Sequence, residues 1–338
     1  MTEINGRDPN HIDNPTGHPA SATVGTPSSS VPAGGPVPAP GMPREGQTYP
    51  ETLRTATARW WKPVVAILGA VVVFLIANVG LIFGVGIYLA ASNGGDFSME
   101  MLEMSPLMYG VTLLSLVLLL PITWVIVRFI HGQPWGHTFS VLGGLRWTWL
   151  WRMIAVLLPV FVIYMIVFMS LTPDTGPRGA DWLAYALIGA LLMPFQAAAE
   201  EVFFRGYVLR GIGSWFAGER AGFAVGLLIS SLLFMTAHFA ADPWLNLYYF
   251  AFGATLAVAA KLTGGIEVPI AMHVVNNVVS GVIGAYTTDM AKAFDRSVGV
   301  GGPFMLVQIV FVALCTAALV WWLRRGDVAV RVARPVMA

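Results

Sequence analysis

Two adjacent carboxylates and a guanidinium, those of Glu200, Glu201 and Arg205, lie at the end of a long apolar run. Charged side chains in such runs are costly in a membrane and usually have a function. On a helix, Glu201 and Arg205 are one turn apart with the acid N-terminal, the favourable order for an ion pair. Glu200 is rotated by about 100° from Glu201. The spacing predicts that Glu201 pairs with Arg205 and leaves Glu200 for chemistry; the alternative is a solvated charge patch.

Polar side chains also interrupt two later apolar runs. His238 ends the segment 234–238, and His273 lies one helical turn before Asn277, with Asn276 close to the same face. Carboxylate and imidazole groups can transfer protons, and amide groups can donate hydrogen bonds to a developing charge, so these residues could form a reaction site. The alternatives are a capping role for His238 and interhelical hydrogen bonding by His273 and Asn277.

The remaining polar residues near apolar runs are interpreted as loop or interface residues, because neither their spacing nor their surroundings suggests a ligand set. They are His131, His137, Asp242, Asn246 and Lys261. The single cysteine, Cys315, excludes an intrachain disulfide and a cysteine-rich metal site.

The composition of the 338-residue chain is that of a polytopic membrane protein. It is 56% hydrophobic and only 11% charged, which is outside the range of a soluble domain. The net charge of +1 argues against nucleic acid as a partner. The expected surroundings are therefore a lipid bilayer, and the oligomeric state is left open.

Apolar runs of about 20 residues recur from Trp60 onward, each long enough to cross a hydrocarbon core as a helix. A span in lipid must satisfy its own backbone amides, so long runs without alternation predict helices rather than barrel strands. The expected fold is all-α, with about eight transmembrane helices. The predicted spans are 63–91, 106–130, 149–171, 182–204, 221–239, 244–262, 267–287 and 303–323.

Three segments follow from this pattern. A tail rich in Pro, Gly and Ser, residues 1–58, has too few aromatic residues to fold and is expected to be disordered. A multi-helix domain, 59–326, precedes a short tail, 327–338. Lys and Arg concentrate before the first predicted span, between the second and third, and after the fourth, sixth and eighth. This asymmetry predicts a cell-membrane protein with both termini cytoplasmic, and the composition of the first tail favours a bacterial host.

Three motifs occur in order in successive polar-bearing helices: Glu-Glu-x-x-x-Arg, Phe-x-x-x-His and His-x-x-x-Asn. Together they resemble the CPBP family of intramembrane proteases, which includes the type II CAAX prenyl endopeptidases and the bacterial Abi-type proteins. Each motif alone is unspecific, whereas their combination, order and apolar setting are specific. The resemblance covers residues 180–290. The sequence lacks a His-Glu-x-x-His helix, a Gly-x-Ser-Gly nucleophile and a Gly-x-Gly-Asp loop, the motifs of other intramembrane proteases.

The resemblance implies an intramembrane endopeptidase, a hydrolase whose partner is a membrane-associated or lipid-anchored protein or peptide substrate. The residues carried over by motif position are Glu200 and His238, which activate water, His273 and Asn277, which stabilise the oxyanion, and Glu201 and Arg205, which support them. The alternative is a non-catalytic membrane protein, with a role in immunity, scaffolding or transport, that uses the same polar network for binding.

The sequence leaves open whether a metal takes part. Glu200, His238 and His273 have the right ligand types for zinc, with a fourth position for water. They come from three helices without a diagnostic local spacing, so the residues favour no obligate metal and zinc is kept only as an option.

The depths of the candidate residues set a condition on this site. Counted by helical rise from the connection 210–220, Glu200 lies roughly 15 Å deep, with His273 shallower and His238 deeper. A tilt, or a fifth span that begins partly outside the lipid, must bring them level.

Overall fold

The computed structural model describes residues 39–96, 98, 103, 105–171, 179–290 and 294–333. In these ranges, 8 helices are long and apolar enough to cross a membrane, so the predicted all-α, multi-pass membrane fold is confirmed. The spans are formed by α1 (Trp61–Ser92), α2 (Pro106–Val117) with α3 (Leu119–Val125), α4 (Trp147–Leu171), α5 (Trp182–Phe203) with α6 (Leu209–Gly213), α7 (Glu219–Thr236), α8 (Pro243–Thr263), α9 (Glu267–Thr287) and α11 (Met305–Arg324).

The fourth span is longer than predicted. After α5 the chain passes through a π-helical turn, Phe204–Val208, directly into α6. The helix therefore continues to Gly213 instead of ending near residue 204. Such π-helical turns are rare and often lie at functional sites, and this one contains Arg205.

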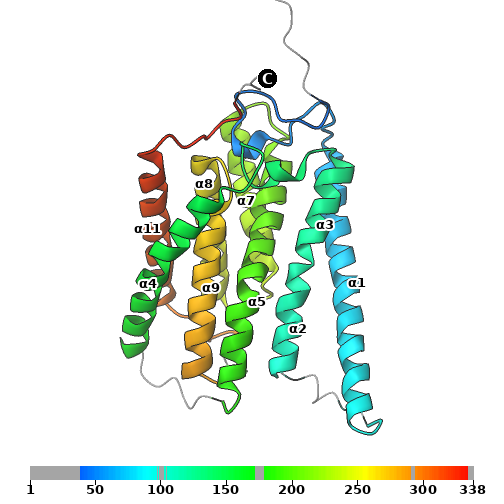
Figure 1. Cartoon of the computed structure of the whole chain (residues 1–338), viewed down its shortest axis with the longest axis vertical. Coiled ribbons are helices and arrows are strands. Elements are labelled where there is room, and N and C mark those ends of the chain that lie inside the picture. The colour runs from blue at the N-terminus through cyan, green and yellow to red at the C-terminus, as the bar shows by residue number, and fades with distance from the viewer. Residues whose placement is uncertain are drawn as a thin grey trace, which may run out of the picture. The chain divides into compact units, whose positions relative to one another are not determined.

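Two of the helices that carry motif residues, α5 and α9, form the centre of the bundle. α5 packs against α2 and α9, and α9 in turn packs against α4 and α8. Figure 1 shows α5 and α9 side by side, with α1 at one edge and α11 at the other. The first and third motifs are therefore held by well enclosed helices, while α1 and α4 expose most of their surface to the surroundings.

Glycines bring the fifth span close to the fourth. Gly222 and Gly226 lie one turn apart on α7 and are buried. A Cβ atom at Gly226 would lie 2.8 Å from the Leu209 carbonyl oxygen, so a larger residue there would push the two helices apart. Small residues at this spacing allow helix backbones to approach closely. α7 therefore begins beside α6 and ends at Thr236, which places His238 in the connection to α8.

An end cap covers the end of the bundle at which the described N- and C-terminal segments lie (Figure 1). It consists of residues 39–58, 131–146 and 327–333. The Val332 backbone N–H donates to the Gln47 carbonyl at 2.9 Å, and the Gly46 N–H donates to the Val332 carbonyl at 2.9 Å. Arg210 in α6 is fully buried against the cap, and its Nε donates to Thr52 Oγ1 at 2.7 Å. The end cap thus fixes the end of the fourth span.

The prediction of a disordered tail over residues 1–58 was wrong for residues 39–58. Tyr49 is fully buried, and its hydroxyl donates to the Thr138 carbonyl. A short segment with few apolar residues can be ordered when it packs on a surface that the spans already provide, because it does not have to form a core of its own. Residues 1–38 lie outside the described residues, where disorder stays a prediction.

A buried histidine in the end cap makes stability depend on pH. His131 is 3% exposed, and its Nε2 lies 3.2 Å from the Tyr207 hydroxyl. Burial, together with the positive charges of Lys62 and Arg210, lowers the pKa of His131 from 6.5 to about 4. The unfolded chain therefore binds more protons between these values. The contribution of neutral His131 to the free energy of unfolding is fully present above pH 6.5 and is lost as the pH falls toward 4.

We expect the apparent melting temperature of the detergent-solubilised protein to fall between about pH 7 and about pH 5. The fall should be smaller in His131→Gln, because glutamine can still hydrogen-bond to Tyr207 but does not titrate. Differential scanning fluorimetry at constant ionic strength measures both proteins. An equal fall of the melting temperature in the two proteins would contradict the assignment of this pH dependence to His131.

Candidate active site

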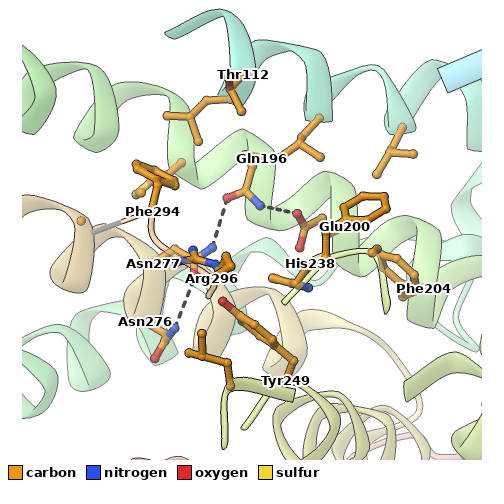
Figure 2. Close-up of a pocket in the computed structure, with 18 of the residues that line it drawn as sticks. Thr112, Gln196, Glu200, Phe204, His238, Tyr249, Asn276, Asn277, Phe294 and Arg296 are labelled. Atoms are coloured by element: carbon orange, nitrogen blue, oxygen red, sulfur yellow. Dashed lines mark hydrogen bonds between the residues drawn. The ribbon is translucent and has the colours of Figure 1, made fainter. Parts of the chain in front are cut away.

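A cavity of about 750 Å³ lies among the spans that carry the three motifs. α1 and α2 give it an apolar wall that includes Ile67, Phe74 and Leu113. Polar side chains from α5, α8, α9 and the connection after α7 gather along another part of its lining (Figure 2). They include Gln196, Glu200, His238, Tyr249, Asn276 and Asn277. A substrate in this cavity would meet an apolar wall and one polar edge.

Glu201 and Arg205 form the ion pair that their spacing predicts. Both side chains are fully buried, and Arg205 Nη1 donates to Glu201 Oε1 at 2.7 Å. The guanidinium carbon of Arg205 lies 4.5 Å from the centroid of the Phe234 ring, a cation–π contact with α7. His273 Nδ1 lies 2.7 Å from the same oxygen of Glu201. Because a carboxylate accepts, His273 Nδ1 carries the hydrogen, and the pair joins α5 to both α7 and α9.

Glu200 is adjacent to Glu201 on α5 and lines the cavity. It is 6% exposed, and its Oε1 accepts a hydrogen bond from Gln196 Nε2 at 2.6 Å. Its Oε2 has no hydrogen-bond partner among the residues that the structure describes and lies 3.6 Å from His273 Nε2. One oxygen of Glu200 is therefore fixed by Gln196, and the other is buried without a hydrogen-bond partner.

His238 meets Glu200 at this cavity because α7 ends two residues before it. Burial is the main cause that lowers the pKa of His238, which lies between two spans, so its ring is neutral. His238 Nδ1 lies 2.7 Å from the Phe234 carbonyl, which only accepts, so Nδ1 is the donor and Nε2 keeps its lone pair. The ring stacks on Tyr249 with centroids 3.8 Å apart. His238 thus presents a proton-accepting nitrogen in a fixed orientation.

The two residues expected at the oxyanion lie in different surroundings. Asn277 lines the cavity, and its Nδ2 donates to Gln196 Oε1 at 3.1 Å. This amide nitrogen has a second hydrogen that can donate to a bound group. His273 is 2% exposed and lies behind the cavity lining, with both ring nitrogens near carboxylates of α5. The cavity thus brings together Glu200, His238 and Asn277.

Gln196 and Tyr249 contact the candidate residues but were missed by the sequence analysis. Gln196 bonds to Glu200, and Tyr249 stacks on His238. The only sequence signal for Gln196 is an amide one helical turn before Glu200 in an apolar run. No comparable signal exists for Tyr249, because aromatic residues are common at the ends of membrane spans.

The side chains considered for zinc do not form a ligand set. Within the described ranges, no group of three or more His, Cys, Asp or Glu side chains could hold a metal ion. His273 uses its Nδ1 on Glu201, and His238 uses its Nδ1 on the backbone, so Nε2 is the lone-pair nitrogen of each ring. No step below is assigned to a metal.

Comparison with known proteins agrees with the geometry. Residues 180–279 match the family model described as Rce1-like type II CAAX prenyl endopeptidase. The uncharacterized protein YyaK of Bacillus subtilis (strain 168) is 27% identical over 233 residues, which cover 64% of this chain and 75% of YyaK. No solved structure matches the chain. The matched range contains all the candidate residues, so residues 180–279 are a domain of the Rce1-like type II CAAX prenyl endopeptidase family.

Proposed function

We propose that this protein is an intramembrane endopeptidase that hydrolyses peptide bonds in membrane-associated or lipid-anchored proteins or peptides. One observation carries the proposal: the unpartnered carboxylate oxygen of Glu200 and the lone-pair nitrogen of His238 belong to residues that line one cavity inside a bundle of apolar spans. The family match supports protease chemistry. The apolar wall of the cavity supports a substrate that arrives from the lipid.

In the proposed reaction, Glu200 Oε2 and His238 Nε2 hold a water molecule and direct its oxygen at the carbonyl carbon of the substrate. When the new C–O bond forms, Glu200 takes a proton from the water, and the second N–H of Asn277 donates to the oxyanion. When the C–N bond breaks, the proton passes from Glu200 to the leaving nitrogen. The products are a new carboxyl terminus and a new amino terminus.

His273 has a positioning role in this proposal, in place of the oxyanion role that the resemblance implies. Its Nδ1 hydrogen is used on Glu201, and its Nε2 faces Glu200 Oε2 at 3.6 Å. It holds Glu201 in place and packs behind the reactive carboxylate, while Asn277 faces the substrate.

A comparison of peptide termini in membranes tests the proposal. Cells make either the wild-type protein or Glu200→Gln at equal levels in the membrane, and new amino termini are labelled and identified by mass spectrometry. We expect a set of termini in membrane-associated proteins that occurs with the wild type and is lost with both Glu200→Gln and His238→Ala. Identical sets in the wild type and Glu200→Gln would contradict a protease and favour a binding role for the same polar network.

We also propose that both chain ends lie in the cytoplasm, because Lys and Arg concentrate in the connections on that side. In a Cys315→Ser background, single substitutions Asp96→Cys and Asp289→Cys should react with an impermeant maleimide added to intact cells. Arg325→Cys should react only after the membrane is opened. The reverse labelling pattern would contradict this topology.

A further inference from the structure

A chain of four hydrogen bonds leads from α8 through α9 to Glu200. The Tyr248 hydroxyl donates to Asn276 Oδ1 at 3.2 Å, and Asn276 Nδ2 donates to Asn277 Oδ1 at 3.1 Å. Asn277 Nδ2 donates to Gln196 Oε1 at 3.1 Å, and Gln196 Nε2 donates to Glu200 Oε1 at 2.6 Å. Figure 2 shows the last three bonds along the polar edge of the cavity.

All four bonds point in the same direction. Each amide accepts from the preceding residue through its oxygen and donates to the next through its nitrogen, so the bonds polarise one another toward Glu200. The last bond is the shortest of the four, as expected for a bond to a charged acceptor. Every donor and acceptor in this series of hydrogen bonds therefore has a partner when Glu200 accepts from Gln196 and the N–H groups of Asn277 lie on the cavity side.

Gln196 is the link between the residue that activates water and the residue that donates to the oxyanion. It lies one turn before Glu200 on α5 and is 5% exposed. Its amide nitrogen holds Glu200, and its amide oxygen holds Asn277 of α9. No other described side chain is hydrogen-bonded to both of them in this structure. A shift of α9 relative to α5 would have to break one of these two bonds.

We propose that this chain of hydrogen bonds fixes the separation and orientation of Glu200 and Asn277, and that Gln196 is a positioning residue of the active site. The inference rests on the proposed function and adds to it three residues outside the three motifs: Gln196, Tyr248 and Asn276. Gln196 touches neither the attacking water nor the substrate carbonyl in this arrangement. It acts through the two residues that do.

Two measurements on Gln196→Leu test the proposal. Infrared difference spectra, each taken against the same protein with Glu200→Gln added, isolate the carboxylate band of Glu200. That band should shift in Gln196→Leu, because its carboxylate loses an N–H donor. The yield of the Glu200-dependent peptide termini should fall by about tenfold, because one charge-assisted hydrogen bond is lost from the reactive geometry. A merely structural role would change the yield of folded protein but not the Glu200 band.

Two further variants give a graded test. Tyr248→Phe is nearly isosteric and removes only the first donor of the chain, so it should fold and lower cleavage by about two- to threefold. Gln196→Glu places a second carboxylate against Glu200, and the two would share one proton. The acidic limb of its pH–rate profile should move to higher pH. The titratable or charged groups near Glu200 in addition are Glu201 and Arg205 on α5, Tyr249 on α8, His273 on α9 and His238 after α7.

Thr123→Val is the matched control. Thr123 is buried in α3 and is not among the residues that line the cavity, and its hydroxyl donates within its own helix, to the Leu119 carbonyl at 2.6 Å. The Glu200 band and the product yield should be unchanged in this variant. The proposal is overturned if Gln196→Leu and Tyr248→Phe match Thr123→Val in both measurements. If no Glu200-dependent termini exist at all, the proposed function fails, and the band shift still decides whether the chain holds Glu200.

Discussion

Replacing Glu200 with glutamine should lower peptide hydrolysis by about 10³-fold or more. Glutamine cannot take a proton from the attacking water, so the step that forms the C–O bond loses its base. Its amide oxygen can still accept from Gln196 Nε2, as Glu200 Oε1 does, so the fold should be retained. The measurement is the rate at which the Glu200-dependent termini appear, in membranes with equal amounts of each protein.

Glu219→Gln is the matched control for this substitution. Glu219 is a partly exposed acid that pairs with Lys261 and Arg331 at the surface, away from the cavity. Its loss should leave the cleavage rate within about twofold of the wild type. A Glu200→Gln protein that melts like the wild type and still cleaves at a comparable rate would assign the proton transfer to another group.

Replacing Arg205 with alanine should lower the free energy of unfolding by about 3–5 kcal/mol. The Arg205 and Glu201 side chains are both 0% exposed, so removing the guanidinium leaves a buried carboxylate without its ion-pair partner. The loss also removes the cation–π contact with Phe234. Denaturant or thermal unfolding in detergent, followed by intrinsic tryptophan fluorescence, measures the effect.

A double variant and an exposed pair make this prediction specific. Arg205→Met combined with Glu201→Gln should recover much of the lost stability, because replacing both members of a buried ion pair is often close to neutral. Arg331→Ala removes the partner of Glu219 from an exposed pair, in which Arg331 is 52% exposed, and should cost less than about 1 kcal/mol. Equal losses in Arg205→Ala and Arg331→Ala would contradict the importance of the buried pair.

The spans and the ion pair could be predicted because simple periodic rules determine them. The thickness of the hydrocarbon core sets the length of an apolar run, and the helical repeat sets which side chains share a face. These two rules were enough to predict eight spans and the contact between Glu201 and Arg205, both of which the structure contains. The family resemblance then selected Glu200, His238 and Asn277, whose side chains line one cavity. It also selected His273, which lies behind the lining.

The lengths of the fourth and fifth spans could not be predicted, because they depend on contacts far apart in the sequence. Arg210 was interpreted as part of a loop, yet it is buried in α6 by Thr52 and Gln133 of the end cap. This extension to Gly213 puts more helical turns between Glu200 and the end of the fourth span, and α7 ends at residue 236 rather than 239. His238 then reaches the cavity of Glu200, which the count of helical rises alone did not place at its level.

The position of Gln196 shows a second reason why sequence falls short. Its role depends on two bonds to different helices, and a lone amide in an apolar run carries no pattern that identifies either partner. The position of the His273 ring could not be predicted for a similar reason. Its distance from Asn277 along α9 predicts a shared face, but Glu201 of α5 holds its ring away from the cavity.

The contact between the two terminal segments in the end cap has a consequence for biosynthesis. Arg331 Nη1 donates to the Gly46 carbonyl across 285 positions of the chain, so this contact forms only when nearly the whole protein has left the ribosome. At normal rates of translation, residues 39–58 wait on the order of tens of seconds for their partner. The eight described spans are therefore synthesised before this contact can form, whereas the contacts of residues 39–58 with Thr138 and Arg210 need only the first four spans.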